Sequence, residues 1–271
     1  MENDEAREDG KPPVTVGLQD GVRTLTLDAP HHRNALSARL VAALYAALEA
    51  AEADPETRAV LLTHTGNTFC AGADLSEASG EAAPADAPLD APLALARLLR
   101  TLVAFPKPVV ARVTGHVRAG GTGLLAACDI SVAGPGATFA FTEARIGVAP
   151  AVISMPVLPR MDARAAARYW LTGERFGPEE AARVGLVTLA AEDPDEALAP
   201  VLDGLRRGSP QGLMESKRLV SRKVLEAFDR DTGTLAELSA RLFASPEAHE
   251  GMTAFLERRD PEWAARHTPV R

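Results

Sequence analysis

The chain has 271 residues, of which 46% are hydrophobic and 24% are charged, and its formal net charge is −8 at pH 7. Such a chain can bury a full core as one large domain, or as one domain with a helical appendage. The acidic balance argues against nucleic acid as the main partner, because phosphate binding needs a dominant basic surface. Cys70 and Cys128 lie in apolar stretches without metal-ligand spacing, so neither a disulfide framework nor a zinc site is expected.

The N-terminal sequence MENDEAREDGKPP is acidic and polar, which is the opposite of a signal peptide. We expect residues 1–12 to form a disordered tail. No apolar run approaches the roughly 18 residues that are needed to span a bilayer. These features predict a cytoplasmic protein without a membrane partner.

The first half of the chain alternates predicted strands and helices. Residues 14–27 contain two β-rich runs around Asp20 and Gly21, a pair typical of a hairpin turn. Ser37 is a plausible N-cap for a helix with apolar residues at helical spacing, and a short apolar strand follows at residues 58–66. Residues 76–92 are rich in Ala, Pro, Asp and Glu without periodicity, and we expect a mobile loop there.

A helix is expected at residues 93–105, before strands at residues 107–117, 129–134 and 137–141. From about residue 160 onward the pattern is mostly helical. Alternating strands and helices followed by helices alone indicate an α/β core with a helical C-terminal part.

A faint internal repeat joins two of these strands. VLLTHTGNTFCAG and VVARVTGHVRAG share an apolar strand, Thr-Gly, a few residues and then Ala-Gly. Two such turns can converge on one ligand oxygen, where each backbone N–H donor typically lowers a reaction barrier by roughly 3 kcal/mol. The second turn also opens a predicted helix, whose N-terminal partial charge adds to the effect. Taken one at a time, these glycines fit ordinary tight turns equally well.

Residues 121–126, GTGLLA, offer a rival interpretation as a dinucleotide-binding fingerprint. Glu143 comes twenty residues after Gly123, about where a ribose-binding acid is expected. However, only about seven helix-compatible residues follow Gly123 before the next strand, whereas the helix of a βαβ unit needs about ten or more. This alternative also leaves FCAGADL unexplained, so it is the weaker one.

Four motifs resemble those of the crotonase superfamily, the enoyl-CoA hydratase/isomerase family, in order and spacing. They are RNALS at residues 33–37, FCAGADL, AGGTGLLAACDI and FTEARIGVAPAVISMPVL. The resemblance implies an α/β fold, a spiral of ββα units capped by C-terminal helices that build trimers or dimers of trimers. We accordingly expect the spiral core over residues 13–200 and the helical, trimer-forming region over residues 201–271.

The resemblance also implies an acyl-CoA thioester as the substrate. Its carbonyl oxygen would accept from the N–H of Ala73 and from the N–H of Gly120, the middle position of the family's glycine triplet. The CoA moiety would be held by Arg33, Ala35, Ala71, Asp74 and Leu75. The substrate's own CoA is the only cofactor implied, no metal is implied, and the expected assembly is a homotrimer or a dimer of trimers.

The chain departs from the family pattern at one catalytic position. Typical hydratases carry two glutamates, and here the first position is Gly123 while the second is Glu143. A single carboxylate must both remove and return the proton, or share these tasks with another group. We expect Gly123 to leave space for water or for a substrate carboxylate.

The resemblance is strongest to the bacterial branch that hydrates methylglutaconyl-CoA or isohexenylglutaconyl-CoA. It therefore predicts an enoyl-CoA hydratase, with a branched glutaconyl-type substrate. The alternatives are a 3-enoyl to 2-enoyl-CoA isomerase and a catalytically silent homologue that only binds acyl-CoA.

Overall fold

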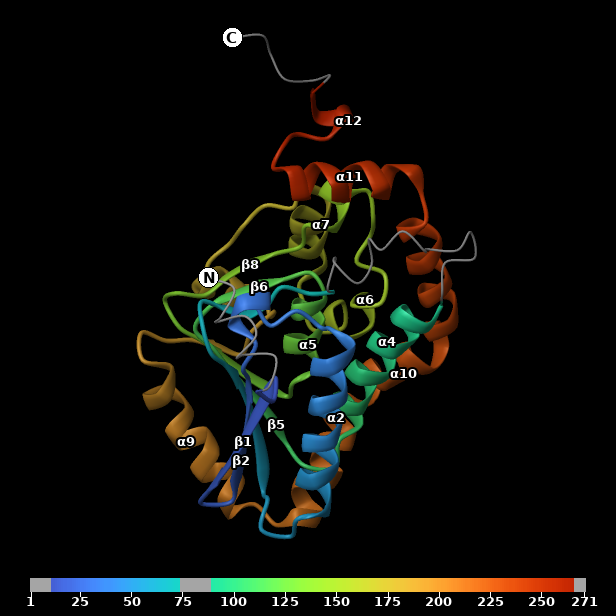
Figure 1. The fold of residues 1–271 in the computed structure, drawn as a ribbon. Coiled ribbons are helices and arrows are strands. Elements are labelled where there is room, and N and C mark those ends of the chain that lie inside the picture. Colours follow the sequence, from blue (N-terminus) through green and yellow to red (C-terminus); the bar gives the residue numbers. More distant parts are fainter. Residues whose placement is uncertain (1–10, 74–88, 266–271) are drawn as a thin grey trace.

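The computed structural model describes residues 11–73 and 89–265 (Figure 1). The tail expected at residues 1–12 and the loop expected at residues 76–92 therefore lie largely outside the described residues. The C-terminal end of that expected loop is wrong, because residues 90–92 form the first turn of helix α4 (Asp90–Ala104). Pro92 is tolerated there, since the first turn of a helix needs no N–H donor.

Within the described residues, the larger sheet has six strands in the order β1-β2-β3-β5-β7-β9. The predicted hairpin is confirmed: β1 (Val14–Gln19) and β2 (Val22–Leu27) are antiparallel, and Asp20 and Gly21 both have positive φ. All later neighbours in this sheet pair in parallel. These strands are β3 (Ala59–His64), β5 (Val109–Val113), β7 (Ile130–Ala133) and β9 (Leu189–Ala190).

The smaller sheet explains the repeat in the sequence. Its parallel strands are β4 (Thr68–Cys70), β6 (His116–Arg118) and β8 (Thr138–Ala140), and each comes directly after a strand of the larger sheet. The chain thus delivers one strand to each sheet in every turn of a spiral. Sequence reasoning recognised two of these turns by their Thr-Gly and missed the third, which reads Gly-Pro-Gly at residues 134–136.

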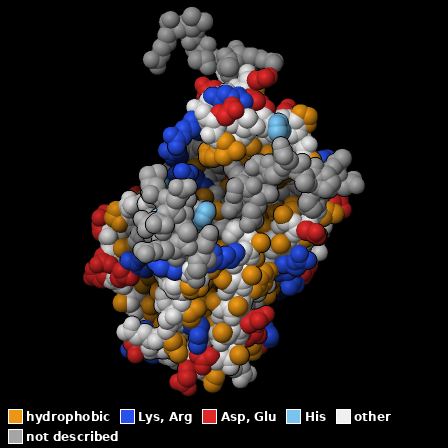
Figure 2. Space-filling model, viewed as in Figure 1, with side chains coloured by type: hydrophobic (Ala, Val, Ile, Leu, Met, Phe, Trp, Pro, Cys, Tyr) orange, Lys and Arg blue, Asp and Glu red, His pale blue; other side chains and the backbone are white. Residues whose placement is uncertain are grey.

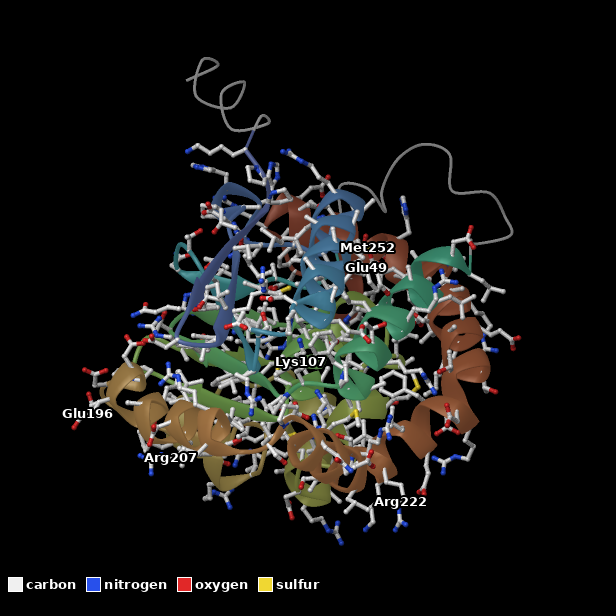
Figure 3. The ribbon with its side chains drawn as sticks, turned by 90° about the horizontal axis from the view of Figure 1, so that it is seen from below. Glu49, Lys107, Glu196, Arg207, Arg222 and Met252 are labelled. Carbon is white, nitrogen blue, oxygen red and sulfur yellow. The ribbon has the colours of Figure 1, made fainter. Side chains whose placement is uncertain are left out.

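Helices enclose the larger sheet from two sides. Figure 1 shows α9 (Pro194–Arg207) on one side and α2 (Ala38–Ala53), α4 and α10 (Pro210–Phe243) on the other. The predicted cap of α2 is confirmed, since the Ser37 side chain accepts from Leu40 N. At the other end of α2, the Lys107 ammonium donates to the carbonyls of residues 51, 52 and 54. Glu196, Arg207 and Arg222 point outward from α9 and α10, whereas Lys107 is half-buried and lies near the middle of this view from below (Figure 3).

The second half of the chain is mostly helical, as the sequence predicts. Helix α9 runs through residue 200, the position expected to separate core from helical region. No helix within the described ranges is long and apolar enough to cross a membrane. The other elements are α5 (Gly120–Ala127), α6 (Ser154–Val157), α7 (Ala163–Thr172), α8 (Pro178–Arg183), α11 (Pro246–Glu257), α12 (Glu262–Ala265) and the 3-10 turns η1 (Pro30–His32) and η2 (Glu143–Ile146).

Candidate active site

The turns that follow β4 and β6 lie directly against each other. A Cβ atom added to Gly72 would lie 2.9 Å from Gly120 N, and one added to Gly120 would lie 3.6 Å from Ala73 N. Gly72 has a φ of +94°, a region that other residues rarely adopt. The structure therefore brings together Ala73 and Gly120, the two residues predicted to donate to a thioester oxygen. Within the described residues, neither backbone N–H donates a hydrogen bond.

Small residues around these turns permit the close approach. A Cβ atom on Gly121 would lie 2.8 Å from Cys70 Cβ, so the end of β4 packs onto the first turn of α5 only because that position is glycine. Cys70 is fully buried, which raises the pKa of its thiol to about 12. The thiol therefore stays protonated at neutral pH and fills space. The sequence around residues 70–73 and 119–121 is poor in large side chains because the main chains of the two turns are in direct contact.

Residues 33–36 pack against the turn that follows β4. Leu36 N donates to Gly72 O at 2.8 Å, and Ala71 N donates to Arg33 O at 3.1 Å. Arg33 is exposed and Ala35 is buried. The predicted CoA-binding residues Arg33, Ala35 and Ala71 are thus neighbours of the Ala73 turn, whereas Asp74 and Leu75 lie outside the described residues.

Asn34 is a structural residue that sequence reasoning missed. It is fully buried with a φ of 50°, and its Oδ1 accepts from Ala29 N at 2.8 Å. Its Nδ2 donates to Thr65 O and to Thr68 O. The side chain therefore ties residues 33–36 to the first Thr-Gly turn. The signal was present in the RNALS motif, since asparagine tolerates the left-handed region better than most residues.

Glu143 begins η2 and is the predicted acid/base. Glu143 is only 7% exposed, and its Oε2 has no hydrogen-bond partner within the described part of the chain. Burial raises the pKa of Glu143 to about 7, against the smaller opposing effect of hydrogen bonds from its own backbone and that of Thr142. A carboxyl group with this pKa exchanges a proton readily near neutral pH, as a general acid/base requires.

The expected space beside Gly123 does not exist. A Cβ atom there would lie 2.5 Å from Ile153 Cγ2 and 3.1 Å from Leu99 Cδ1. The aliphatic side chains of α4 and of the segment before α6 have taken the volume that a glutamate would use. The expectation that this position admits water or a substrate carboxylate is therefore wrong. Composition gave no signal for this, because Ile153 lies thirty residues further along the chain.

The rival dinucleotide interpretation fails on the geometry. Helix α5 has 8 residues, too few for the crossover helix of a βαβ unit. Glu143 lies in η2, after β8, and not at the end of the strand that follows α5. A ribose-binding acid belongs at the end of that next strand.

These features define an α/β protein of the crotonase fold, with two backbone donors at the meeting of two turns. The sequence matches the enoyl-CoA hydratase/isomerase family over residues 17–266, and the chain belongs to that family. A crystal structure of an enoyl-CoA hydratase from Mycobacterium avium has a TM-score of 0.87 and 52% identity, covering 93% of this chain and 99% of that one.

Two further relatives carry more specific names. The 2,3-dehydroadipyl-CoA hydratase of Escherichia coli K12 is 31% identical over 256 residues, which are 93% of this chain and 99% of that protein. The crystal structure of a carnitinyl-CoA hydratase from Mycobacterium avium has 27% identity and a TM-score of 0.78. The match covers 94% of this chain and 100% of that one. Their names agree on hydration of a CoA ester and differ in the acyl group. The chain is accordingly an enzyme of the hydratase type.

Proposed function

We propose that the protein adds water across the 2,3 double bond of an acyl-CoA thioester, with Ala73, Gly120 and Glu143 as its catalytic groups. The observation that carries this proposal is the meeting of the two turns, because both N–H groups lack an acceptor within the described residues. Two such donors polarise a thioester carbonyl and stabilise the negative charge that develops on its oxygen. Arg33, Ala35, Ala71, Asp74 and Leu75 are the proposed contacts of the CoA moiety.

In the proposed reaction, the Glu143 carboxylate removes a proton from water while the water oxygen bonds to Cβ. The electron pair of the double bond moves toward the thioester, and Ala73 and Gly120 donate to the enolate oxygen. Glu143 then returns its proton to Cα, which restores the carboxylate and yields the 3-hydroxyacyl-CoA. The near-neutral pKa of Glu143 suits both proton transfers. The mechanism uses only protein groups, water and the substrate.

A branched glutaconyl-type ester is the proposed acyl group, and resemblance to the glutaconyl-CoA hydratase branch supports it. The side chains of Ile153 and Leu99 mean that the substrate carboxylate must lie elsewhere than beside Gly123. A homotrimer or dimer of trimers is the proposed assembly, and sedimentation velocity would test it.

Isomerisation of 3-enoyl-CoA to 2-enoyl-CoA is a second candidate, favoured by the same aliphatic wall. An isomerase moves one proton between two carbons of the substrate and gains from the exclusion of water. A single buried carboxylate, such as that of Glu143, fits that task.

A panel of CoA esters distinguishes these functions. The purified protein is incubated with crotonyl-CoA, 3-methylglutaconyl-CoA and a 3-enoyl-CoA, and the absorbance of the conjugated thioester is followed. Loss of absorbance with either 2-enoyl ester supports hydration, and the faster of the two identifies the acyl class. Gain of absorbance from the 3-enoyl ester, at a rate above any hydration, would replace the hydratase by the isomerase. Binding without turnover of any ester would indicate a silent homologue.

A further inference from the structure

The short turn that carries Glu143 is held between two helices from distant parts of the chain. Figure 1 shows α11 crossing the top of the molecule above α7, and η2 contacts both helices. On the outside, Figure 2 shows charged side chains over this uppermost part and hydrophobic side chains below it. The position of the catalytic carboxyl therefore depends on α11, which begins more than one hundred residues after Glu143.

The contact between α11 and η2 is made by main chain against main chain. A Cβ atom on Gly251 would lie 2.5 Å from Ile146 C and 2.6 Å from Ile146 O. From the other side, a Cβ atom on Gly147 would lie 2.6 Å from Glu247 O. Neither glycine can gain a methyl group unless the helix and the turn move apart. Val148, Ala248 and Met252 form a small buried cluster across the same contact.

On the opposite side, α7 fixes the same turn through its C-terminal carbonyl. The Arg145 guanidinium donates twice to Thr172 O, at 3.1 and 2.9 Å. The turn is closed internally by Val148 N, which donates to Glu143 O at 3.0 Å. The turn η2 is therefore held by α7 on one side and packed against α11 on the other.

From this geometry we propose that Gly251 is a positioning residue for the acid/base, and that α11 keeps water away from the Glu143 carboxyl by seating on η2. The inference rests on the proposed function of Glu143. Moving α11 outward would admit water, lower the pKa of Glu143 toward the value of a solvated glutamate, and displace the carboxylate from the reacting carbons.

Burial raises the pKa of Glu143 and backbone hydrogen bonds partly oppose this shift, and among the described residues no charged side chain contributes to it. On α11, Glu250 is paired with Arg259, and on α7, Arg168 is paired with Glu174. The remaining charged or titratable groups on these two helices are Arg164, Tyr169, Glu247, His249 and Glu257, and the Tyr169 hydroxyl donates to Glu180.

The test compares Gly251→Ala with Gly233→Ala. Both replace a glycine within a helix, and a Cβ atom on Gly233 would meet nothing within 4 Å. Both variants gain helix propensity equally, so a difference between them reports the contact with η2. We expect Gly251→Ala to lower kcat by about 10-fold to 100-fold with KM within a few-fold. We also expect the acid limb of its kcat/KM profile to move to lower pH, while Gly233→Ala keeps the wild-type profile.

Met252→Ala provides a milder second variant if Gly251→Ala does not fold. It removes volume from the buried cluster without forcing the backbones apart, and it should move the acid limb in the same direction by less. An unchanged acid limb in a folded Gly251→Ala or Met252→Ala protein would overturn the positioning role. If Glu143→Gln itself keeps wild-type turnover, the proposed function fails instead, whatever the Gly251 result.

Discussion

Gly123 and Glu143 occupy the two positions at which typical hydratases carry carboxylates, and the structure treats them in opposite ways. Around Gly123, Ile153 and Leu99 pack onto the backbone so closely that no side chain fits. At Glu143, an ionisable group is buried, and one of its oxygens has no hydrogen-bond partner among the residues that the structure describes. A buried polar atom without a partner is costly, and this supports the acid/base role proposed for Glu143. Position 123 is thus committed to packing, whereas the buried carboxyl group at position 143 is available for the proposed proton transfer.

Loss of the carboxylate at position 143 should have the largest effect. Glu143→Gln keeps the shape and removes the base, so we expect kcat to fall by roughly 100-fold or more. Affinity for a CoA ester, measured by calorimetry with a non-reacting acyl-CoA, should change little, because the backbone donors remain. Turnover within a few-fold of wild type would remove Glu143 from the mechanism.

Placing a glutamate at position 123 tests whether the packing of Ile153 and Leu99 excludes a side chain there. Gly123→Glu forces a side chain into Ile153, and overpacking of this kind typically costs about 1–3 kcal/mol of stability. We expect a lower melting temperature and lower hydration activity with every ester. Adding Ile153→Ala to Gly123→Glu should recover part of the stability by removing the clashing methyl groups. A stable Gly123→Glu variant with improved crotonyl-CoA hydration would mean that Ile153 and Leu99 can move aside to accommodate the side chain.

The pKa of Glu143 predicts how activity depends on pH. With a pKa of about 7, Glu143 is a carboxylate at high pH, and if it is the proposed base, kcat/KM at pH 6 should be about 10-fold below its plateau. Because the folded pKa is raised above the unfolded value, protonation of Glu143 favours the folded state, and that stabilisation is lost as the pH rises from about 4.5 to about 7. Glu143→Gln should therefore raise the melting temperature at pH 8 relative to wild type. Equal melting temperatures at pH 8 would argue against the raised pKa.

The sequence predicted the hairpin at Asp20, the cap at Ser37 and the two converging turns, because each depends on local chemistry or on a repeated local pattern. It failed where distant segments decide the outcome. The filling of the space at Gly123 depends on Ile153, and the third turn of the spiral has no Thr-Gly to mark it. The turn η2 that carries Glu143 is likewise packed against α11, which begins more than one hundred residues later. Motifs indicate which atoms are present, whereas long-range packing determines the room around them.

Ala119, just before the first residue of α5, is the reverse case to Gly123 within that helix. At Gly123 the packing excludes a side chain, whereas Ala119 carries a side chain in a backbone conformation that favours glycine. Ala119 has φ 45° and ψ −122°, a conformation that glycine adopts much more readily than alanine. Ala119→Gly should relieve this strain, while it adds some entropy to the unfolded chain.

We expect a net stabilisation of about 1 kcal/mol, seen as a small rise in melting temperature with kcat and KM unchanged. Ala127→Gly, at the C-terminal end of the buried helix α5, is the matched control and should lose stability, because it removes helix propensity without relieving strain. If both variants lost stability, the strained turn would have to be held by its contact with Gly72, whose added Cβ would lie 2.9 Å from Ala119 Cβ. The side chain at 119 would then belong to the packing that sets the two N–H donors.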